Sequence, residues 1–291
     1  MTGKRVLITG AGKDGGFGQA LALAAGLGGA ASVGVHFHRS YADGFDLVNA
    51  LRAEGVSAFP VQADVTNMGD LWASRTYIID QMGGTPDLVV CNSGLTEKGY
   101  SFGRALKEVE GEPAAVRRAR VRQHFIDNLE ETRTVLDTKI DGFLAVTHLW
   151  AGEAVYGKNP TRIVYISSRQ ALEPGVSVPG YSIANFAVLA LPEVLRVNLG
   201  KAAEAVSAFS VCYPFIRTGM TDEYADNPKV FGRWQPRMLE PHEAAGQLME
   251  LLSRPVDETD GGIFDLLVEG TADDVDLYWR RVRLEAQTEK L

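Results

Sequence analysis

Short apolar runs alternate with helical segments along the chain, and this alternation constrains the fold more than any other feature of the sequence. Seven runs have the composition of buried strands, at residues 5–9, 31–37, 58–63, 87–91, 162–167, 205–212 and 263–268. The first four are almost continuously apolar, which is typical of parallel strands that helices cover on both faces. Helical segments at residues 19–27, 41–54 and 67–82 separate them. We therefore expect an α/β fold with a single doubly wound parallel sheet and helices on both faces.

Two segments depart from this alternation. Residues 96–138 form a long, charge-rich stretch that contains Arg117, Arg118, Arg120 and Arg122. We expect an inserted helical segment, which is either a solvated helix or a lid with a basic patch for an anionic part of a substrate. Residues 273–291 are expected to form a C-terminal extension with an exposed or subunit-docking helix. The sequence has no internal repeat and no Pro- or Ser-rich linker, so residues 1–291 are predicted to form one domain.

The charge and cysteine content argue against several classes of protein. The chain has 29 Lys and Arg residues against 37 Asp and Glu residues, whereas a nucleic-acid-binding protein needs a clustered basic face. Because Cys91 and Cys212 are the only cysteines, we expect no disulfide scaffold and a cytoplasmic location. The five histidines show no metal-ligand spacing, so no metal site is predicted. Residues 15–35 are uncharged but rich in Ala and Gly, which favours a buried helix and strand over a membrane span.

A glycine-rich loop follows the first predicted strand and opens the first helix. It reads TGAGKDGGFG from Thr9 to Gly18. Glycines in this position allow a tight turn and let backbone N–H groups approach a phosphate, while the helix presents its positive N-terminal end. We predict that Gly10, Gly16, Phe17 and Gly18 bind the pyrophosphate of a dinucleotide.

This loop resembles the Thr-Gly-x3-Gly-x-Gly motif of the short-chain dehydrogenase/reductase family, whose members have a Rossmann-type fold. Five residues separate Gly10 from Gly16, two more than in the family motif. The longer spacing resembles that of the enoyl-acyl-carrier reductases, and TGAGKD also resembles the ketoreductase domain of fungal fatty acid synthases. The resemblance extends from about residue 5 to about residue 270, apart from residues 96–138.

Further positions that match the family follow three of the predicted strands. The resemblance implies cofactor contacts for Asp64 and Val65 after the third strand, Asn92 and Gly94 after the fourth, and Pro214 and Thr218 after the sixth. In the family these places hold an Asp near the adenine, an Asn-Asn-Ala-Gly motif, and a Pro-Gly motif with a downstream Thr on the nicotinamide side. Phe215 replaces the glycine of the last motif, so we expect a different backbone there.

The residues after the second strand indicate the preferred cofactor. An acid at this place hydrogen-bonds the 2′-hydroxyl of NAD, whereas a basic residue accommodates the 2′-phosphate of NADP. The sequence has His38, Arg39 and Ser40 here, and the first acid is Asp43. Arg39 offers a charged, planar donor and Ser40 a hydroxyl group. This segment resembles the same place in pteridine reductases, which use NADPH, so we predict NADP(H), with NAD(H) as the less favoured alternative.

The family's catalytic residues are a Ser, a Tyr, a Lys four residues after the Tyr, and an Asn on the preceding helix. The Tyr transfers a proton, the Ser polarises the substrate oxygen, and the Lys lowers the pKa of the Tyr and binds the nicotinamide ribose. Ser168 ends the fifth predicted strand, and Tyr181 follows 13 residues later, which is the family spacing. The resemblance therefore implies these two roles for Ser168 and Tyr181.

The Lys and the Asn of the family stand in exchanged positions in this chain. Asn185 lies four residues after Tyr181, and Lys139 lies three residues before Gly142, the usual place of the Asn. One hypothesis is that Lys139 supplies the missing positive charge from the neighbouring helix, while Asn185 hydrogen-bonds the ribose or a relay water. The alternative is that position 185 has lost its role and that Lys139 is a surface lysine.

Three functions remain open at this point. The first is an NADP(H)-dependent ketoreductase or alcohol dehydrogenase that acts on a small carbonyl or alcohol substrate. The second is an enoyl reductase, although the place of that class's lysine is Val188 here. The third is a nucleotide-binding protein without ordinary redox activity, either lyase-like or a sensor. Arg169 and Arg217 either reach an anionic substrate or pair with nearby acids. The resemblance implies a homodimer or homotetramer, and the charge and composition given above argue against nucleic-acid or membrane partners.

Overall fold

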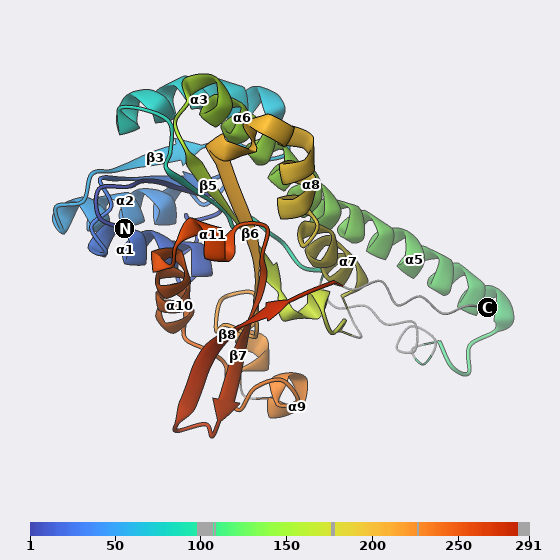
Figure 1. The fold of residues 1–291 in the computed structure, drawn as a ribbon. Coiled ribbons are helices and arrows are strands. Elements are labelled where there is room, and N and C mark those ends of the chain that lie inside the picture. Colours follow the sequence, from blue (N-terminus) through green and yellow to red (C-terminus); the bar gives the residue numbers. More distant parts are fainter. Residues whose placement is uncertain (98–106, 108, 176–177, 226, 285–291) are drawn as a thin grey trace, which may run out of the picture.

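The computed structural model describes residues 1–97, 107, 109–175, 178–225 and 227–284, and Figure 1 shows its elements. Residues 98–106 and 108 of the predicted insertion, and residues 285–291 of the predicted extension, lie outside the described residues.

One eight-stranded sheet organises the chain, with the strand order β3-β2-β1-β4-β5-β6-β7-β8. Its strands are β1 (Arg5–Ile8), β2 (Ser32–Phe37), β3 (Ala58–Gln62), β4 (Leu88–Cys91), β5 (Thr161–Ser168), β6 (Val206–Tyr213), β7 (Ile263–Gly270) and β8 (Val275–Val282). Strands β1 to β7 are parallel, so the predicted doubly wound parallel sheet is confirmed. The strand order reverses between β1 and β4, and open α/β sheets bind ligands beyond the carboxyl ends of their strands at such a point.

Helices cover both faces of this sheet (Figure 1). The face with α1 (Phe17–Leu27), α2 (Tyr41–Ala53) and α10 (Pro241–Ser253) is packed around one apolar cluster. The opposite face, with α3 (Met68–Met82), α6 (Gly142–Gly157) and α8 (Leu191–Leu199), is packed around another. Successive strand residues alternate between the two faces, since Tyr165 of β5 joins the second cluster and Ile166 the first.

The remaining elements lie mainly at the carboxyl edge of the sheet and along one side of the molecule. They are α5 (Ala114–Leu136), α7 (Pro179–Val188), α9 (Pro228–Phe231), α11 (Val256–Thr259), the π-helix η1 (Asp137–Asp141), and the short 3₁₀ helices η2 (Arg169–Ala171), η3 (Gly200–Ala205) and η4 (Asp222–Tyr224).

The C-terminal extension forms a strand, so the expected helix after residue 273 is wrong. β8 pairs antiparallel with β7 over its whole length. The side chains of Val275, Leu277 and Trp279 pack against the first apolar cluster, while the residues between them face solvent. This alternation has the period of a strand, and it places the Trp279 ring 5.5 Å from the Tyr213 ring at an angle of 78°.

α5, η1 and α6 follow one another without a break, and α5 extends away from the body of the molecule (Figure 1). Val135 is the only buried residue of α5, and Arg117, Arg118, Arg120 and Arg122 are exposed on it. The end of α5 packs against α7. The π-helix η1 lies between α5 and α6, and its wider turn rotates the side chains of α6 relative to those of α5. Such π-turns are frequent at functional sites.

One segment passes a length and hydropathy test for a membrane span. Residues Pro179–Ala205 have a mean hydropathy of 1.3 over an 18-residue window. In the structure this segment comprises the three short elements α7, α8 and η3, with Pro192 inside it and Val188 and Leu189 in the apolar core. A single segment of this kind is weak evidence for a membrane span.

Candidate active site

A cavity of about 720 Å³ opens beyond the carboxyl ends of the central strands. Nearly all the predicted site residues line it: Gly10, Gly16, Phe17, Gly18, His38, Arg39, Ser40, Asp64, Val65, Asn92, Gly94, Lys139, Ser168, Tyr181, Pro214 and Thr218. Asn185 is the one predicted residue that does not. The fold therefore gathers segments distant in sequence around one space that is large enough for a cofactor and a substrate.

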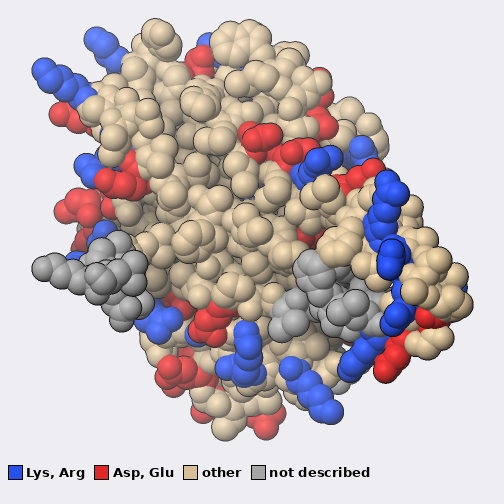
Figure 2. Space-filling view, turned by 90° about the vertical axis from the view of Figure 1, so that its right-hand side faces the viewer, with Lys and Arg blue, Asp and Glu red and all other residues tan. Residues whose placement is uncertain are grey.

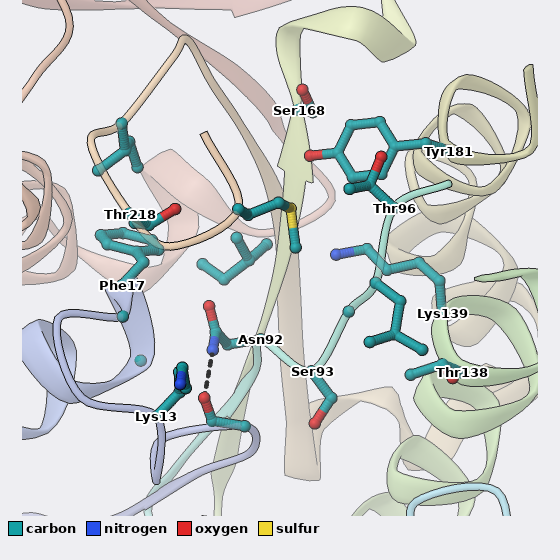
Figure 3. A pocket seen from close by; sticks show the side chains of 18 of the residues that line it. Lys13, Phe17, Asn92, Ser93, Thr96, Thr138, Lys139, Ser168, Tyr181 and Thr218 are labelled. Atoms are coloured by element: carbon teal, nitrogen blue, oxygen red, sulfur yellow. Dashed lines mark hydrogen bonds between the residues drawn. The ribbon is translucent and has the colours of Figure 1, made fainter. Parts of the chain in front are cut away.

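The glycine loop has the close backbone approaches that its composition predicts. Gly10 has a φ of 65°, in the left-handed region that favours glycine. A Cβ atom on Gly18 would overlap the Gly10 carbonyl oxygen and lie 2.6 Å from Nδ2 of Asn92. Asn92 donates from Nδ2 to the carbonyl oxygens of Thr9 and Gly10, both at 3.1 Å (Figure 3). The N-cap residue of α1 is Gly16, which has no side chain to accept the first N–H groups of the helix. These N–H groups are therefore available to donate to phosphate oxygens.

His36, which the sequence interpretation missed, supports this loop from below. It is buried in β2, and its Nδ1 accepts a hydrogen bond from the Gly10 backbone N–H at 3.2 Å. Burial lowers the pKa of His36 to about 4, so the imidazole is neutral at neutral pH and can act as an acceptor. The signal in the sequence was a histidine inside an otherwise apolar strand.

Arg39 follows β2 and lines the cavity, and the acid Asp64, which follows β3, lines it as well. Arg39 is exposed, and Lys13 lines the cavity from the glycine loop. Asp43 lies in the first turn of α2, where its carboxylate is 4.0 Å from Nζ of Lys13. On the adenine side, Asp64 lies 3.6 Å from Nδ1 of His38. Partial burial raises the pKa of Asp64, but hydrogen bonds from Thr66 and the nearby charges of His38 and Arg39 hold it below its ordinary value.

Ser168 and Tyr181 meet at the other end of the cavity. Ser168 ends β5 and Tyr181 lies in the first turn of α7, and the Tyr181 hydroxyl points toward the end of β5 beside Ser168 (Figure 3). Burial raises the pKa of Tyr181, and hydrogen bonds with the Ser168 and Asn185 side chains act in the opposite direction. The phenol is therefore protonated at neutral pH in the absence of a further positive charge.

Lys139 lies in the π-helix η1, and its ammonium points into the cavity on the same side as Tyr181 (Figure 3). The residue is only 6% exposed, so the structure excludes the alternative of a surface lysine. Its Nζ lies 4.6 Å from the centroid of the Phe143 ring, a cation–π contact. Burial lowers the pKa of Lys139 to about 7, so its charge changes close to neutral pH.

Asn185 is fully buried on α7, behind the cavity rather than in its wall. Its Nδ2 donates to the backbone carbonyl of Tyr181 at 2.9 Å, and its backbone carbonyl accepts from Oγ of Ser167, also at 2.9 Å. Asn185 is therefore not part of the cavity wall, and its contact with a ribose or a relay water stays a prediction. The physical reason is length, because an Asn side chain bonds its own helix where a Lys would reach past it.

We compared the chain with known protein families. The short chain dehydrogenase family profile matches residues 4–229. The chain belongs to the short-chain dehydrogenase family. No protein with a curated description matches it.

Solved structures of short-chain dehydrogenases have the same fold at low sequence identity. A short-chain type dehydrogenase/reductase from Mycobacterium marinum is 22% identical, with a TM-score of 0.70 over 91% of this chain and 93% of that chain. A gluconate 5-dehydrogenase from Burkholderia cenocepacia, in complex with NADP and tartrate, is 19% identical, with a TM-score of 0.73 over 91% and 94%. A 3-ketoacyl-(acyl-carrier-protein) reductase from Brucella melitensis, complexed with NADH, is 21% identical, with a TM-score of 0.69 over 91% and 96%.

The two arginines near this short-chain dehydrogenase site have different surroundings. Arg169 lines the cavity beside Ser168, and its Nη1 donates to the Trp234 carbonyl at 3.1 Å. Arg217 lies outside the cavity lining and forms an ion pair with Glu240 at 3.3 Å. Of the two readings, Arg217 pairs with a nearby acid, while Arg169 stays available to a substrate.

Glu97 is the second buried residue of this short-chain dehydrogenase that the sequence interpretation missed. It follows β4 closely and accepts hydrogen bonds at the start of α7. No local sequence signal marks it, because its partners lie 83 and 84 residues away. Among the described residues, no group of three or more His, Cys, Asp or Glu side chains could hold a metal ion.

Proposed function

We propose that the protein is an NADP(H)-dependent short-chain dehydrogenase/reductase that reduces a ketone, or oxidises the corresponding alcohol, with Tyr181 as the acid/base. The observation that carries this proposal is one cavity with the glycine loop at one end and the neighbouring Ser168 and Tyr181 side chains at the other. The close contacts of Gly10 and Gly18 with neighbouring backbone fit a dinucleotide whose phosphates lie against the loop. The nicotinamide of that cofactor would supply or accept the hydride when it is bound.

The chain's own residues would then handle the proton. Oγ of Ser168 would hydrogen-bond the substrate oxygen, and the hydroxyl of Tyr181 would donate its proton to that oxygen as the carbonyl is reduced. A phenolate forms on Tyr181 as the proton leaves, and burial disfavours that charge. A positive charge nearby is needed to offset this cost.

Lys139 is our candidate for that charge, in place of the family's lysine at position 185. Its buried ammonium enters the cavity from η1, on the side of Tyr181, rather than from α7. A protonated Lys139 stabilises the developing phenolate by charge alone, because the interaction of two charges is strong where water is excluded. Asn185 would act on Tyr181 from behind, through α7.

NADP(H) is the cofactor we favour. Arg39 lines the cavity just after β2, where the sequence has no acid before Asp43, and Lys13 lines it from the glycine loop. A guanidinium and an ammonium around one place match the 2′-phosphate that distinguishes NADP from NAD. The two cations come from different segments, so the site does not depend on Arg39 alone.

A small carbonyl compound with an apolar part would fit the remaining space. The cavity wall beyond Ser168 includes Phe215 and Trp234, whose ring centroids are 5.5 Å apart, with Arg169 beside them. We also propose a homodimer or homotetramer. Exposed apolar residues lie on α5, α7 and α8, at Phe125, Leu129, Ile183, Phe186, Val194 and Val197. Figure 2 shows a broad area with few charged side chains on that side of the molecule.

The enoyl reductase alternative is less favoured by the structure. Val188, at the place of that class's lysine, is 1% exposed in the apolar core, and an ammonium there would be costly. The third alternative, a nucleotide-binding protein without ordinary redox activity, is distinguished from our proposal by the turnover assay.

NADPH oxidation, followed by absorbance with a panel of aldehydes, ketones and β-keto esters, tests the proposal. We expect turnover with at least one carbonyl compound, a strong preference for NADPH over NADH, and loss of turnover in Tyr181→Phe. Tight NADPH binding without oxidation across the panel would instead support the non-redox reading. Turnover confined to enoyl thioesters would support the enoyl reductase.

A further inference from the structure

The helix that carries Tyr181 begins without a cap of its own. α7 starts at Pro179, which has no backbone N–H, and the preceding Val178 has no polar side chain to offer. The first N–H groups of the helix, those of Gly180 and Tyr181, need acceptors from elsewhere in the protein. Gly180 is buried, so water does not readily serve this purpose.

Glu97 supplies both acceptors from a distant part of the chain. Its Oε1 accepts from the Gly180 N–H at 2.6 Å, and its Oε2 accepts from the Tyr181 N–H at 3.1 Å. The next N–H, of Ser182, bonds the Val178 carbonyl at 3.0 Å, so every N–H of the first turn has a partner. The carboxylate also complements the positive end of the helix.

α5 holds Glu97 in place from the other side. Oγ1 of Thr132 donates to Oε1 of Glu97 at 3.2 Å, and Glu97 is only 4% exposed. A Cβ atom on Gly180 would overlap Oε1 of Glu97 and lie 2.8 Å from Cγ2 of Thr132. The segment after β4, the end of α5 and the start of α7 therefore meet without spare volume.

We propose that Glu97 is a positioning residue for Tyr181. Its carboxylate fixes the first turn of α7, and this turn sets where the Tyr181 hydroxyl lies relative to Ser168. The proposal rests on the proposed function, in which Tyr181 transfers the proton. In this role Glu97, which follows β4, and Thr132 of α5 would affect the reaction without contacting the substrate.

Glu97→Ala tests this inference, and Glu243→Ala is its matched control. Glu243 is also a capping carboxylate, since it accepts from the Glu240 N–H at 2.8 Å at the start of α10, and no residue of α10 lines the cavity. We expect both variants to lose thermal stability. Only Glu97→Ala should lose kcat, by about 10²-fold, because small displacements of a reacting group cost that much. The KM for NADPH should stay unchanged, and Glu97→Gln, which keeps one acceptor oxygen, should fall between wild type and Glu97→Ala.

Steady-state kinetics with the best carbonyl substrate of the panel, together with amide hydrogen exchange of the first turn of α7, give the outcome. Faster exchange at Gly180 and Tyr181 with a selective loss of kcat supports the inference. A kcat for Glu97→Ala equal to that of Glu243→Ala would overturn it, as would equal losses of kcat and NADPH binding. If Glu97→Ala fails to fold, the same comparison is made with Glu97→Gln. Turnover retained in Tyr181→Phe would show instead that the proposed function itself is wrong.

Discussion

The two ends of the cavity are built in different ways. At the cofactor end, a short glycine loop, the N-terminus of α1 and Asn92 make the site through backbone contacts within a few residues of a strand end. At the catalytic end, Tyr181, Lys139 and Glu97 come from three separate segments, and their positions depend on how helices pack. The first end therefore tolerates little change in the loop itself. At the second end, we propose that Lys139 on η1 supplies the charge that the family's lysine on the next helix would supply.

The largest effect is expected from Tyr181→Phe at the catalytic end. Removing the hydroxyl should lower kcat by about 10³-fold, because general acid–base catalysis contributes factors of this size. NADPH binding should be unchanged, which fluorescence titration measures. Tyr165→Phe is the control, since Tyr165 is buried in β5 with its hydroxyl 2.9 Å from Oγ1 of Thr147, outside the cavity lining. Equal losses of kcat in both variants would contradict a specific role for Tyr181.

Gly18→Ala should have the next largest effect, at the cofactor end. The added Cβ would overlap the Gly10 carbonyl oxygen and press on Asn92, so the loop must shift away from the phosphates. We expect NADPH binding to weaken by about 10²-fold, as for the loss of several charge-assisted hydrogen bonds. Gly152→Ala is the control, because a Cβ on Gly152 meets no atom within 4 Å. Unchanged NADPH affinity in Gly18→Ala would show that the loop does not hold the cofactor.

Arg39→Ala should affect the binding of NADPH and of NADH differently. Loss of the guanidinium should raise the Kd for NADPH about tenfold, as for one charge-assisted hydrogen bond, and leave the Kd for NADH unchanged. Lys13→Ala should have a weaker effect in the same direction, because Lys13 also lies near Asp43. If both cofactors lose affinity equally, Arg39 does not recognise the 2′-phosphate and the preference for NADP is wrong.

Lys139→Met should also change how stability depends on pH, separately from its effect on kcat. The folded-state pKa of about 7 lies below the ordinary value of 10.5, so the unfolded chain binds one more proton between these pH values. The free energy of unfolding of the wild type should therefore rise with pH above 7, by up to about 1.4 kcal/mol per pH unit from this residue. The penalty is fully present below pH 7, where Lys139→Met should be the more stable protein.

Urea unfolding from pH 6 to pH 10 measures this difference. Lys201→Met is the control, because Lys201 is exposed and should not change the pH dependence. Parallel stability curves for wild type and Lys139→Met would mean that Lys139 is not buried as the structure shows.

Much of the cofactor end could be predicted from the sequence, because its chemistry is local. The strands are short apolar runs, and each cofactor motif follows a strand end at a readable spacing. The spacing from Ser168 to Tyr181 is equally local, since both residues belong to one short stretch of chain that contains η2 and the start of α7. Lys139 could be located by its distance from Gly142, and its burial then excluded the reading of it as a surface lysine.

The features that sequence analysis missed depend on contacts between distant segments or on a short-period pattern. Glu97 has no motif around it, because it caps a helix that begins more than 80 residues later. His36 reads as part of a strand until its bond to Gly10 is seen. β8 was expected to be a helix because charged residues stand between its apolar residues, so the alternation typical of a strand was not recognised. Asn185 matches a family position, yet its short side chain turns back to α7.

The pH dependence of kcat tests most directly the central claim, that Lys139 supplies from a neighbouring helix the charge missing at position 185. For carbonyl reduction by the wild type, kcat should fall as the pH rises through about 7, because Lys139 then loses its proton. In Lys139→Met this change near neutral pH should be absent, and kcat below pH 7 should be lower than in the wild type. A Lys139→Met variant with the wild-type kcat and the same pH profile would contradict the claim.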